Sequence, residues 1–308
     1  MRTSVVMATY NGEDYLYEQL DSIRDQSMKA DEVLIFDDGS KDHTVQMISD
    51  YIKDNQLESS WKITLNAQNM GYANNFHKAM SAAQGDYIFF ADQDDIWMPE
   101  KLEKTVAVME KHPEIKLLCT DYDPFSCSEK SPQIPAKSLK RLKKDGSLEK
   151  LDLCSKNIYI SSIGCVMCIS RKFRDAAEPY WVDGWAHDDY AWKMSQCQDG
   201  CYFYHVSLIR RRLHGHNVSM KKLHSPDVRI RYLEDLKSSH VQMLRYAQDF
   251  SLNSEIQHLL KRCIRADDMR RELIENKKFG NCFKLIFYAD CYHSLKSLLM
   301  EPYIALKK

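Results

Sequence analysis

Short apolar runs alternate with amphipathic stretches over the first third of the chain. The apolar runs lie at residues 3–8, 32–36, 61–65 and 87–91. Runs of this length predict strands that are buried on both faces. The stretches between them place apolar residues three and four positions apart, as at Leu16, Leu20 and Ile23, which predicts helices. Four alternations of strand and helix predict an α/β fold, with a mostly parallel, Rossmann-like sheet flanked by helices.

Polar residues at the expected boundaries predict where the helices begin. Asn11 and Ser40 are suited to cap the first two helices. Pro99 is suited to the first position of the helix after residue 91, and Asp95 is expected to cap that helix.

The second half of the chain has a weaker pattern. We expect strands at 115–121, 158–169 and 202–209, and a polar, unpacked loop at 127–150. From Ser225, a capping residue followed by Pro226, the pattern is helical to the end. The sequence therefore predicts one domain over residues 1–222 and a helical C-terminal extension over residues 223–308.

Composition narrows the class of protein. The chain has 308 residues, 44% of them hydrophobic, and a net charge of −1. A near-neutral chain has no general basic field, so we expect no nucleic-acid partner. No apolar run reaches the length of a membrane span, and no signal-peptide core follows the N-terminus, so we expect a cytoplasmic protein.

The ten cysteines are then expected to be reduced thiols. A zinc site is the alternative, formed by Cys165, Cys168, Cys197 and Cys201. The first pair lies in an apolar run and the second has looser spacing, so packing is favoured.

Three carboxylates follow the strand predicted at residues 87–91. They are Asp92, Asp94 and Asp95. Alternate residues of an extended segment point the same way, so Asp92 and Asp94 can reach one divalent cation, with Asp94 favoured for direct coordination. The alternative is a solvated acidic turn that caps a helix.

Three motifs in this order resemble glycosyltransferase family 2. They are residues 7–12 (MATYNG), 36–40 (FDDGS) and 92–97 (DQDDIW). Members are inverting enzymes with the GT-A fold, which act on nucleotide sugars. The third motif is similar to a subset described as rhamnosyltransferases of bacterial surface polysaccharides.

The resemblance implies a UDP- or dTDP-linked sugar donor, with dTDP-rhamnose the leading single candidate. Tyr10 would stack on a pyrimidine base and Asp38 would accept its N3–H. The alternative is that Tyr10 packs and the acids cap a turn. Mg²⁺ or Mn²⁺, held by Asp92 and Asp94, would stabilise the departing diphosphate.

The resemblance also assigns roles in the second half. Asp188 resembles the family's catalytic base, with His187 in place of the more common first acid, and the neighbouring Asp189 is the alternative base. Arg212, His214 and Asn217 resemble a segment that closes over the diphosphate, with His214 as a further metal ligand.

The remaining predicted contacts complete the site. Nucleotide contacts are expected from Thr9, Asn69, Gly71, Asn75 and Asp92. Sugar or acceptor contacts are expected from Trp185 and Gly164, although Trp185 can equally be a core residue.

The predicted function is transfer of a sugar to a hydroxyl of a growing cell-surface polysaccharide, carried on a lipid diphosphate. One alternative is a nucleotidyltransferase, but the glycine-rich basic loop of such enzymes is absent after the first strand. The other is an inactive sugar-nucleotide-binding scaffold, although the metal acids and the base are present.

The C-terminal helices carry an apolar stripe. Its members are Leu285, Tyr288, Tyr292, Leu295 and Leu299. Six lysines and two acids lie from Lys277 onward. This combination predicts peripheral attachment to an anionic membrane surface. Packing on the first domain, or against a second copy in a homodimer, is the alternative.

Overall fold

A parallel four-stranded unit forms the first half of the sheet in the computed structural model, which describes residues 1–128, 131–215 and 225–306. Its strands are β1 (Thr3–Thr9), β2 (Glu32–Asp37), β3 (Trp61–Leu65) and β4 (Tyr87–Ala91), and its helices are α1 (Leu16–Arg24), α2 (Thr44–Asp54) and α3 (Gly71–Ala82). The spatial order is β3-β2-β1-β4, with all three pairings parallel. All five residues of β4 are buried. The predicted alternation is confirmed.

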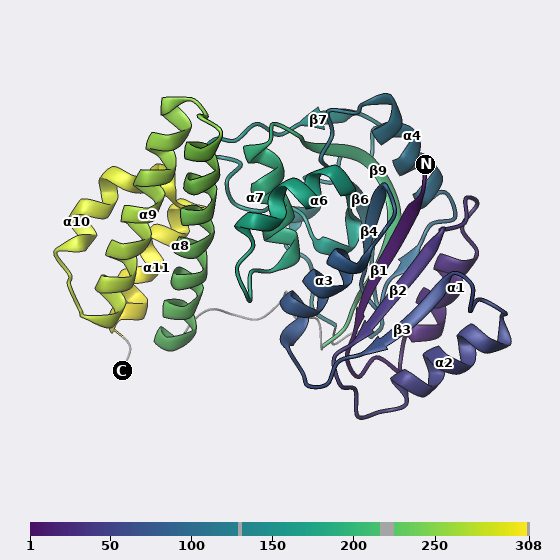
Figure 1. Ribbon diagram of the computed structural model, residues 1–308. Coiled ribbons are helices and arrows are strands. Elements are labelled where there is room, and N and C mark those ends of the chain that lie inside the picture. The colour runs from purple at the N-terminus through teal and green to yellow at the C-terminus, as the bar shows by residue number, and fades with distance from the viewer. Residues whose placement is uncertain (129–130, 216–224, 307–308) are drawn as a thin grey trace.

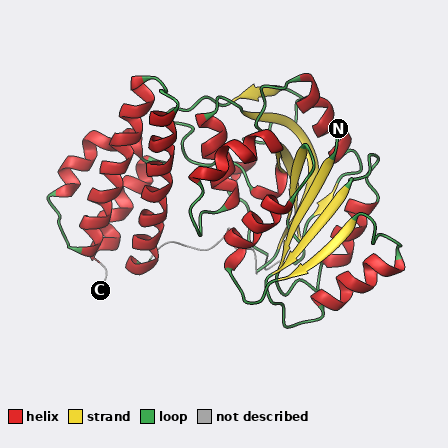
Figure 2. Ribbon diagram, in the orientation of Figure 1, coloured by secondary structure: helices red, strands yellow, loops and turns green. Residues whose placement is uncertain are grey.

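The sheet continues past β4 with strands of mixed direction (Figure 2). They are β5 (Ile96–Trp97), β6 (Leu117–Ser126), β7 (Leu148–Lys150), β8 (Met167–Ser170) and β9 (Cys201–Leu213). Strand β8 runs antiparallel between β4 and β6, whereas β9 is parallel to β6 and long enough to carry both β5 and β7. The α/β class and the mostly parallel character of the predicted sheet are confirmed.

The predicted helix starts are wrong, because the polar residues bond to other partners and because Pro99 lies two residues before the helix that begins at Lys101. Asn11 has a positive φ of 47° and accepts from the Lys41 N–H, and α1 begins only at Leu16. The Ser40 hydroxyl donates to Asp37, and α2 begins at Thr44. Asp95 does not cap α4 (Lys101–Lys111), because it accepts from the backbone of β9.

The region after β6 also differs from the prediction. Within the expected loop at 127–150, α5 (Ala136–Leu139) and β7 are formed. Strand β7 is held by its backbone pairing with β9, which no apolar pattern signals. In the expected strand at 158–169, residues Gly164–Val166 form a 3₁₀ turn (η1), and only β8 is extended.

Helices α6 (Arg171–Ala177) and α7 (His187–Cys197), with the 3₁₀ turn η2 (Glu178–Tyr180), lie between the sheet and the C-terminal helices (Figure 1). The C-terminal elements are α8 (Pro226–Asp249), α9 (Ser254–Glu275), α10 (Asn281–Leu285), η4 (Ile286–Cys291) and α11 (Leu295–Leu306). They form a bundle at one end of the molecule. Ser225 precedes α8 as predicted, although its side chain makes no capping bond.

The predicted apolar stripe does not lie on one helix. Non-helical backbone at Tyr288 separates α10 from α11. Leu285 and Tyr292 are 1% and 6% exposed, whereas Leu299 is 74% exposed. Leu285 and Tyr292 therefore pack inward. None of the described helices combines the length and the apolar character that crossing a bilayer requires.

Buried ion pairs join the C-terminal helices. On α9, Asp267 contacts His240 of α8 at 2.7 Å and Arg270 at 3.1 Å. Arg270 and Arg229 both contact Glu301 of α11, which is fully buried. Because breaking such a buried network leaves an unpaired charge, these contacts hold the helices in one arrangement.

Candidate functional site at the carboxyl ends of the strands

The loops after β1 and β2 are tied together beyond the sheet edge. The Asn11 N–H donates to the Ser40 hydroxyl at 2.9 Å, and the Gly12 N–H donates to the Thr44 hydroxyl at 2.8 Å. The first two motifs therefore meet at the edge where parallel α/β sheets bind ligands.

Gln93 joins the third motif to the first. Its side chain accepts from the Tyr10 N–H at 2.9 Å and donates to the Tyr10 carbonyl at 3.2 Å. A Cβ on Gly12 would lie 2.4 Å from the Gln93 Oε1, so this contact requires glycine there. The Tyr10 side chain stays 47% exposed, as a stacking residue must. Sequence reasoning gave Gln93 no role, and its place between Asp92 and Asp94 was the available signal.

Asp37 and Thr9 hold the loop that follows β2 at the edge of the sheet. The Asp37 carboxylate accepts from the Thr9 hydroxyl, from the Ser40 hydroxyl and from the backbone N–H groups of Gly39 and Ser40. Thr9 is 1% exposed. The side chain of Thr9, a predicted nucleotide contact, is therefore engaged within the protein.

Asp38 organises the start of α3. It is buried and accepts from the Asn66 side chain and from the N–H groups of Met70 and Gly71, at 2.8–3.0 Å. Gly71 has a φ of 81°, which favours glycine. A carboxylate has about four acceptor positions, and the described contacts occupy three of those of Asp38.

The two predicted asparagines differ in position. Asn69 is exposed beside Gly71, whose N–H it accepts. Asn75 is 1% exposed, and its amide bonds Asn66 and the Phe36 carbonyl. The structure therefore brings Asn69 to the site, whereas Asn75 holds α3 against β2.

Asp94 meets His214 at the end of β9. The Asp94 Oδ2 lies 2.6 Å from the His214 Nε2, and both side chains are mostly buried. The Tyr15 ring packs 4.9 Å from the imidazole. This contact is a direct hydrogen bond, and both partners are residue types that bind divalent cations. The structure thus brings together two of the three predicted metal ligands.

Asp92 lies in a second acidic cluster. One ligand atom from each of Asp92, Asp95 and Cys165 lies within 4.8 Å of the others. Burial raises the pKa of Asp92 well above its ordinary value, with further increases from the charges of Asp94 and Asp95. Burial, then the charge of Asp94, raises the pKa of Asp95 to about 7. Crowded carboxylates of this kind are stabilised by a nearby cation.

Cys165 belongs to this cluster, and the zinc alternative would have placed it with Cys168, Cys197 and Cys201. Among the described residues those four thiols do not form a metal-binding group. All ten cysteines are free, as expected of reduced thiols.

Arg212 supports the acidic turn. Its Nε donates to the Asp94 carbonyl at 2.8 Å and its backbone N–H donates to Asp95 at 2.9 Å. Its guanidinium packs over the rings of Tyr15 and Phe125. Arg212 is 6% exposed and braces this turn, whereas its contact with the diphosphate stays a prediction. Asn217, predicted to act with it, lies outside the described residues.

The two candidate bases, Asp188 and Asp189, lie in the first turn of α7 and make different contacts. The Asp189 Oδ2 accepts from the Trp185 indole at 2.7 Å and from the Lys193 ammonium at 2.8 Å. Asp188 uses only Oδ1, which accepts from the Asp189 N–H. Burial, and then the charge of Asp189, raises the pKa of Asp188 to about 6. Among the described contacts, Asp188 thus accepts only a backbone hydrogen bond, whereas Asp189 accepts from an indole and from an ammonium group.

Trp185 and Gly164, the predicted acceptor contacts, are both packed. Trp185 is 6% exposed and meets Tyr190 edge to face. A Cβ on Gly164 would lie 2.2 Å from the Nε2 of His187. His187 stacks on Phe76, and burial lowers the pKa of this imidazole to about 3. Close packing against a neutral His187 therefore accounts for the glycine.

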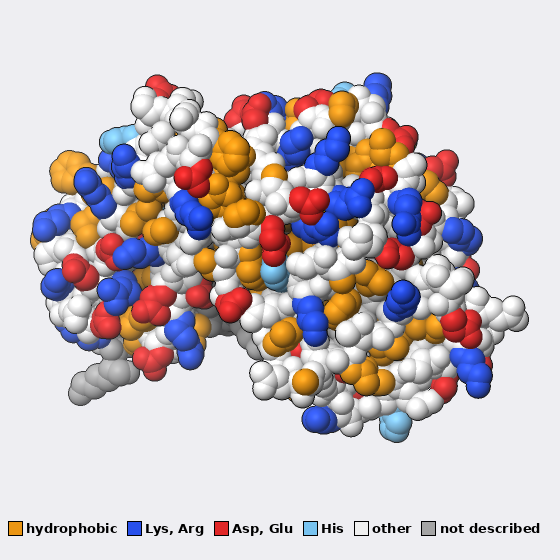
Figure 3. Space-filling model, viewed as in Figure 1, with side chains coloured by type: hydrophobic (Ala, Val, Ile, Leu, Met, Phe, Trp, Pro, Cys, Tyr) orange, Lys and Arg blue, Asp and Glu red, His pale blue; other side chains and the backbone are white. Residues whose placement is uncertain are grey.

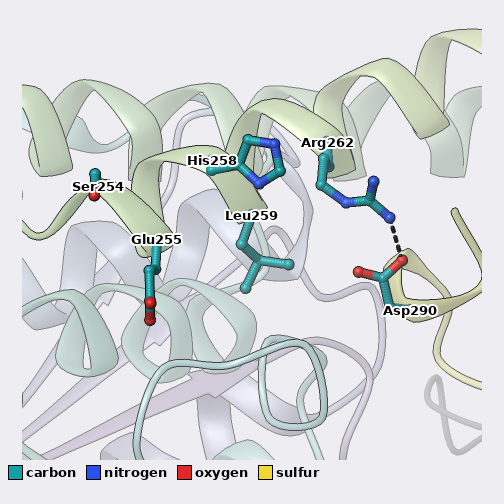
Figure 4. Close-up of a pocket in the computed structure, with 6 residues that line it drawn as sticks. All are labelled: Ser254, Glu255, His258, Leu259, Arg262 and Asp290. Atoms are coloured by element: carbon teal, nitrogen blue, oxygen red, sulfur yellow. Dashed lines mark hydrogen bonds and ion pairs between the residues drawn. The ribbon is translucent and has the colours of Figure 1, made fainter.

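An open hollow lies away from these loops, on the C-terminal helices (Figure 4). Its lining residues are Ser254, Glu255, His258, Leu259, Arg262 and Asp290. The Arg262–Asp290 ion pair, at 2.5 Å, crosses it from α9 to η4. None of the three motifs contributes to this hollow.

Comparisons with known proteins support the same region. Residues 4–173, more than half of the chain, match the model of Glycosyl transferase family 2. The chain is 36% identical over 119 residues to EpsE, a proposed glycosyltransferase of Bacillus subtilis (strain 168), covering 39% of this chain and 42% of EpsE. It is 36% identical over 106 residues to TuaG of the same organism, a proposed teichuronic acid biosynthesis glycosyltransferase, covering 34% of this chain and 41% of TuaG. The matches thus span about two fifths of these relatives.

Two solved structures are similar over nearly the whole chain. TarS 1–349 of S. aureus in complex with UDP-GlcNAc aligns with a TM-score of 0.65 and 19% identity, covering 98% of this chain and 81% of that one. The mannosyltransferase PcManGT of Pyrobaculum calidifontis, in complex with GDP-Man and Mn²⁺, aligns with a TM-score of 0.55 and 16% identity, covering 100% and 81%. These likenesses show a GT-A-like fold, as predicted. With the motif loops meeting at one sheet edge and the family model matching over residues 4–173, the chain belongs to glycosyl transferase family 2.

Proposed function

We propose that this protein is an inverting, metal-dependent glycosyltransferase that moves a sugar from a UDP- or dTDP-sugar to an acceptor hydroxyl. The observation that carries the proposal is the convergence of Asp94 and His214 at the strand ends. The charge of Asp188 contributes to the raised pKa of Asp92, so the base and the acidic turn are close enough to interact.

In this mechanism, Tyr10 and Asp38 bind the base of the donor. Asp94 and His214, with Asp92 nearby, would hold a divalent cation, which supplies stabilisation of the negative charge on the departing diphosphate. Asp188 accepts the proton of the acceptor hydroxyl as that oxygen attacks the anomeric carbon from the opposite face. Carboxylates suit both Mg²⁺ and Mn²⁺, and an imidazole ligand favours Mn²⁺.

The nucleotide of the donor is proposed on the contacts that Tyr10 and Asp38 are predicted to make with a pyrimidine base. Neither contact distinguishes uracil from thymine, and dTDP-rhamnose remains the leading single donor on the likeness of the DQDDIW motif. The fold neighbours bind UDP-GlcNAc in one case and GDP-Man in the other, so fold alone leaves the base open.

The acceptor is proposed to be a cell-surface saccharide on a lipid diphosphate, reached at the cytoplasmic face of the membrane. The chain has a set of exposed apolar side chains in its last three helical segments that supports peripheral attachment. They are Phe283, Ile286, Phe287, Leu299, Tyr303 and Leu306. A homodimer through the same helices is the alternative.

Calorimetric measurement of the binding of a panel of nucleotides tests the proposed function. We expect UDP or dTDP to bind in the presence of Mn²⁺ and to bind more weakly in EDTA, with Asp94→Ala reducing the metal dependence. GDP binding far more tightly than both would contradict the pyrimidine pocket. Sugar-nucleotide binding without turnover of any donor would favour an inactive scaffold, and release of pyrophosphate from a nucleoside triphosphate would favour a nucleotidyltransferase.

A further inference from the structure

The catalytic helix α7 is joined to the C-terminal helices by a buried ammonium group. Lys193 is 1% exposed and lies one helical turn after Asp189. Its Nζ donates to the Asp189 Oδ2 and to the Ser239 hydroxyl of α8, at 2.8 Å in each case. A buried ammonium requires such partners, because desolvation of an unpaired charge is costly.

Asp189 is held on two sides by this arrangement. Its Oδ2 also accepts from the Trp185 indole, in the segment that leads into α7. The Asp189 carboxylate therefore bridges the residues before and after the first turn of α7. The backbone N–H of Asp189 donates to the Asp188 Oδ1. The orientation of Asp188 thus depends on the same turn that Lys193 fixes.

Ser239 is itself fixed within α8. It is 1% exposed, and its hydroxyl donates to the Leu236 carbonyl, which leaves its oxygen lone pairs for the Lys193 ammonium. The adjacent residue, His240, enters the ion-pair network that joins α8 to α9 and α11. The packing of the helical bundle therefore sets the position of Ser239.

We propose that Lys193 is a positioning residue for sugar transfer and that Ser239 of α8 anchors it, so that the C-terminal helices complete the catalytic unit. This rests on the proposed function, in which Asp188 is the base. Lys193 pairs with the Asp189 carboxylate, and Asp188, whose described side-chain contact is with a backbone N–H, receives the proton. The helical extension then contributes to catalysis as well as to attachment.

The test compares four variants with the wild type. Lys193→Met removes the ammonium, Ser239→Ala removes its anchor, and Asp188→Asn reports on the base. The matched control is Lys237→Met on α8, which breaks an exposed ion pair to Asp268 of α9. Donor turnover, donor KM and thermal midpoint are measured for each, with hydrogen exchange of residues 185–193.

For Lys193→Met we expect kcat to fall about 10- to 100-fold, the usual cost of a misplaced catalytic group, with donor KM nearly unchanged. For Ser239→Ala, a loss of about two- to tenfold is expected from one hydrogen bond, with the thermal midpoint preserved because alanine favours a helix. Exchange in residues 185–193 should rise in both variants and not in Lys237→Met.

Wild-type kcat and exchange in folded Lys193→Met and in Ser239→Ala would overturn the proposal. If Lys193→Met does not fold, the result for Ser239→Ala decides. Wild-type protein inert on every donor, or full activity in Asp188→Asn, would instead refute the proposed function, so the two failures are distinguishable. Even in that case, unchanged hydrogen exchange of residues 185–193 in Lys193→Met and Ser239→Ala would count against the positioning role.

Discussion

At the scale of single residues, the two adjacent carboxylates of Asp188 and Asp189 differ in their contacts. Asp189 accepts from the Trp185 indole and the Lys193 ammonium, whereas the described side-chain contact of Asp188 is with one backbone N–H. Burial raises the pKa of Asp188 to about 6, close to the range in which a general base works best. This contrast favours Asp188, on which the sequence alone left a one-position ambiguity.

Replacement of the base gives the first prediction. Asp188→Asn keeps the shape of the side chain and removes the proton acceptor, so transfer should fall by roughly 10²–10⁴-fold while nucleotide binding survives. Initial rates of transfer and calorimetric titration with UDP or dTDP measure the two effects. The same pattern in Asp189→Asn, with Asp188→Asn active, would move the base by one position.

The pH dependence follows from the same carboxyl group. A base with a pKa of about 6 is protonated at lower pH, so kcat/KM should fall about tenfold between pH 7 and pH 5. Because the folded-state pKa is raised, ionisation of Asp188 costs stability, and this cost grows as the pH rises from the ordinary value of 3.8 and is complete above about 6. Asp188→Asn should therefore raise the thermal midpoint at pH 8 and have less effect on it at pH 4. A midpoint that falls at pH 8 would contradict this account.

At the scale of elements, the site is built from loops that follow different strands and hold one another. The loop after β1 bonds to the loop after β2 through Asn11 and Gly12, and to the turn after β4 through Gln93. These bonds fix the backbone on which the exposed Tyr10 ring stands. Fixed loops keep the entropic cost of ordering a ligand site low.

Loss of the Gln93 contact should therefore weaken nucleotide binding. Gln93→Ala releases both backbone groups of Tyr10, and we expect a Kd for UDP or dTDP about tenfold higher, with a small change in thermal midpoint because the bonds lie at an exposed edge. Gln84→Ala, an exposed glutamine that precedes β4 at its other end, is the matched control. Equal affinity in both variants would show that Tyr10 needs no such support.

At the scale of the whole molecule, exposed apolar groups are concentrated at the chain's C-terminal end. Seven of the fifteen large hydrophobic side chains that are exposed among the described residues lie between 279 and 306. Figure 3 shows the visible face of the rest as a mixture of hydrophobic and charged side chains of both signs. Lys284 and Lys296 are exposed within the same segment. Apolar groups flanked by lysines suit an anionic lipid surface.

Vesicle co-sedimentation tests this surface. Phe283 and Phe287 are 76% and 78% exposed, so replacing both with serine should abolish binding to anionic vesicles while leaving the fold intact. Phe250→Ser, at an exposed position between α8 and α9, is the control. Substitution is preferable to truncation, since Glu301 of α11 belongs to the buried ion network. Wild-type protein that ignores anionic vesicles, or dimerises through these phenylalanines, would contradict the membrane surface.

The sequence by itself determined the parts of this protein that depend on local pattern. Apolar runs and amphipathic spacing predicted the first four strands and the helices between them, because burial of one face requires that periodicity. The order of the three motifs predicted the family. Asp92 and Asp94 followed a buried strand, which placed them at the sheet edge.

Tertiary structure decided the contacts between distant positions. Tyr10 and Gln93 are 83 residues apart, Lys193 and Ser239 are 46 apart, and Asp94 and His214 are 120 apart. Periodicity reports which side of an element is apolar, and it carries no information on which polar group an element will meet. The backbone break at Tyr288 likewise turned a stripe predicted on one helix into partly buried packing. These features arise from packing, which only the folded chain determines.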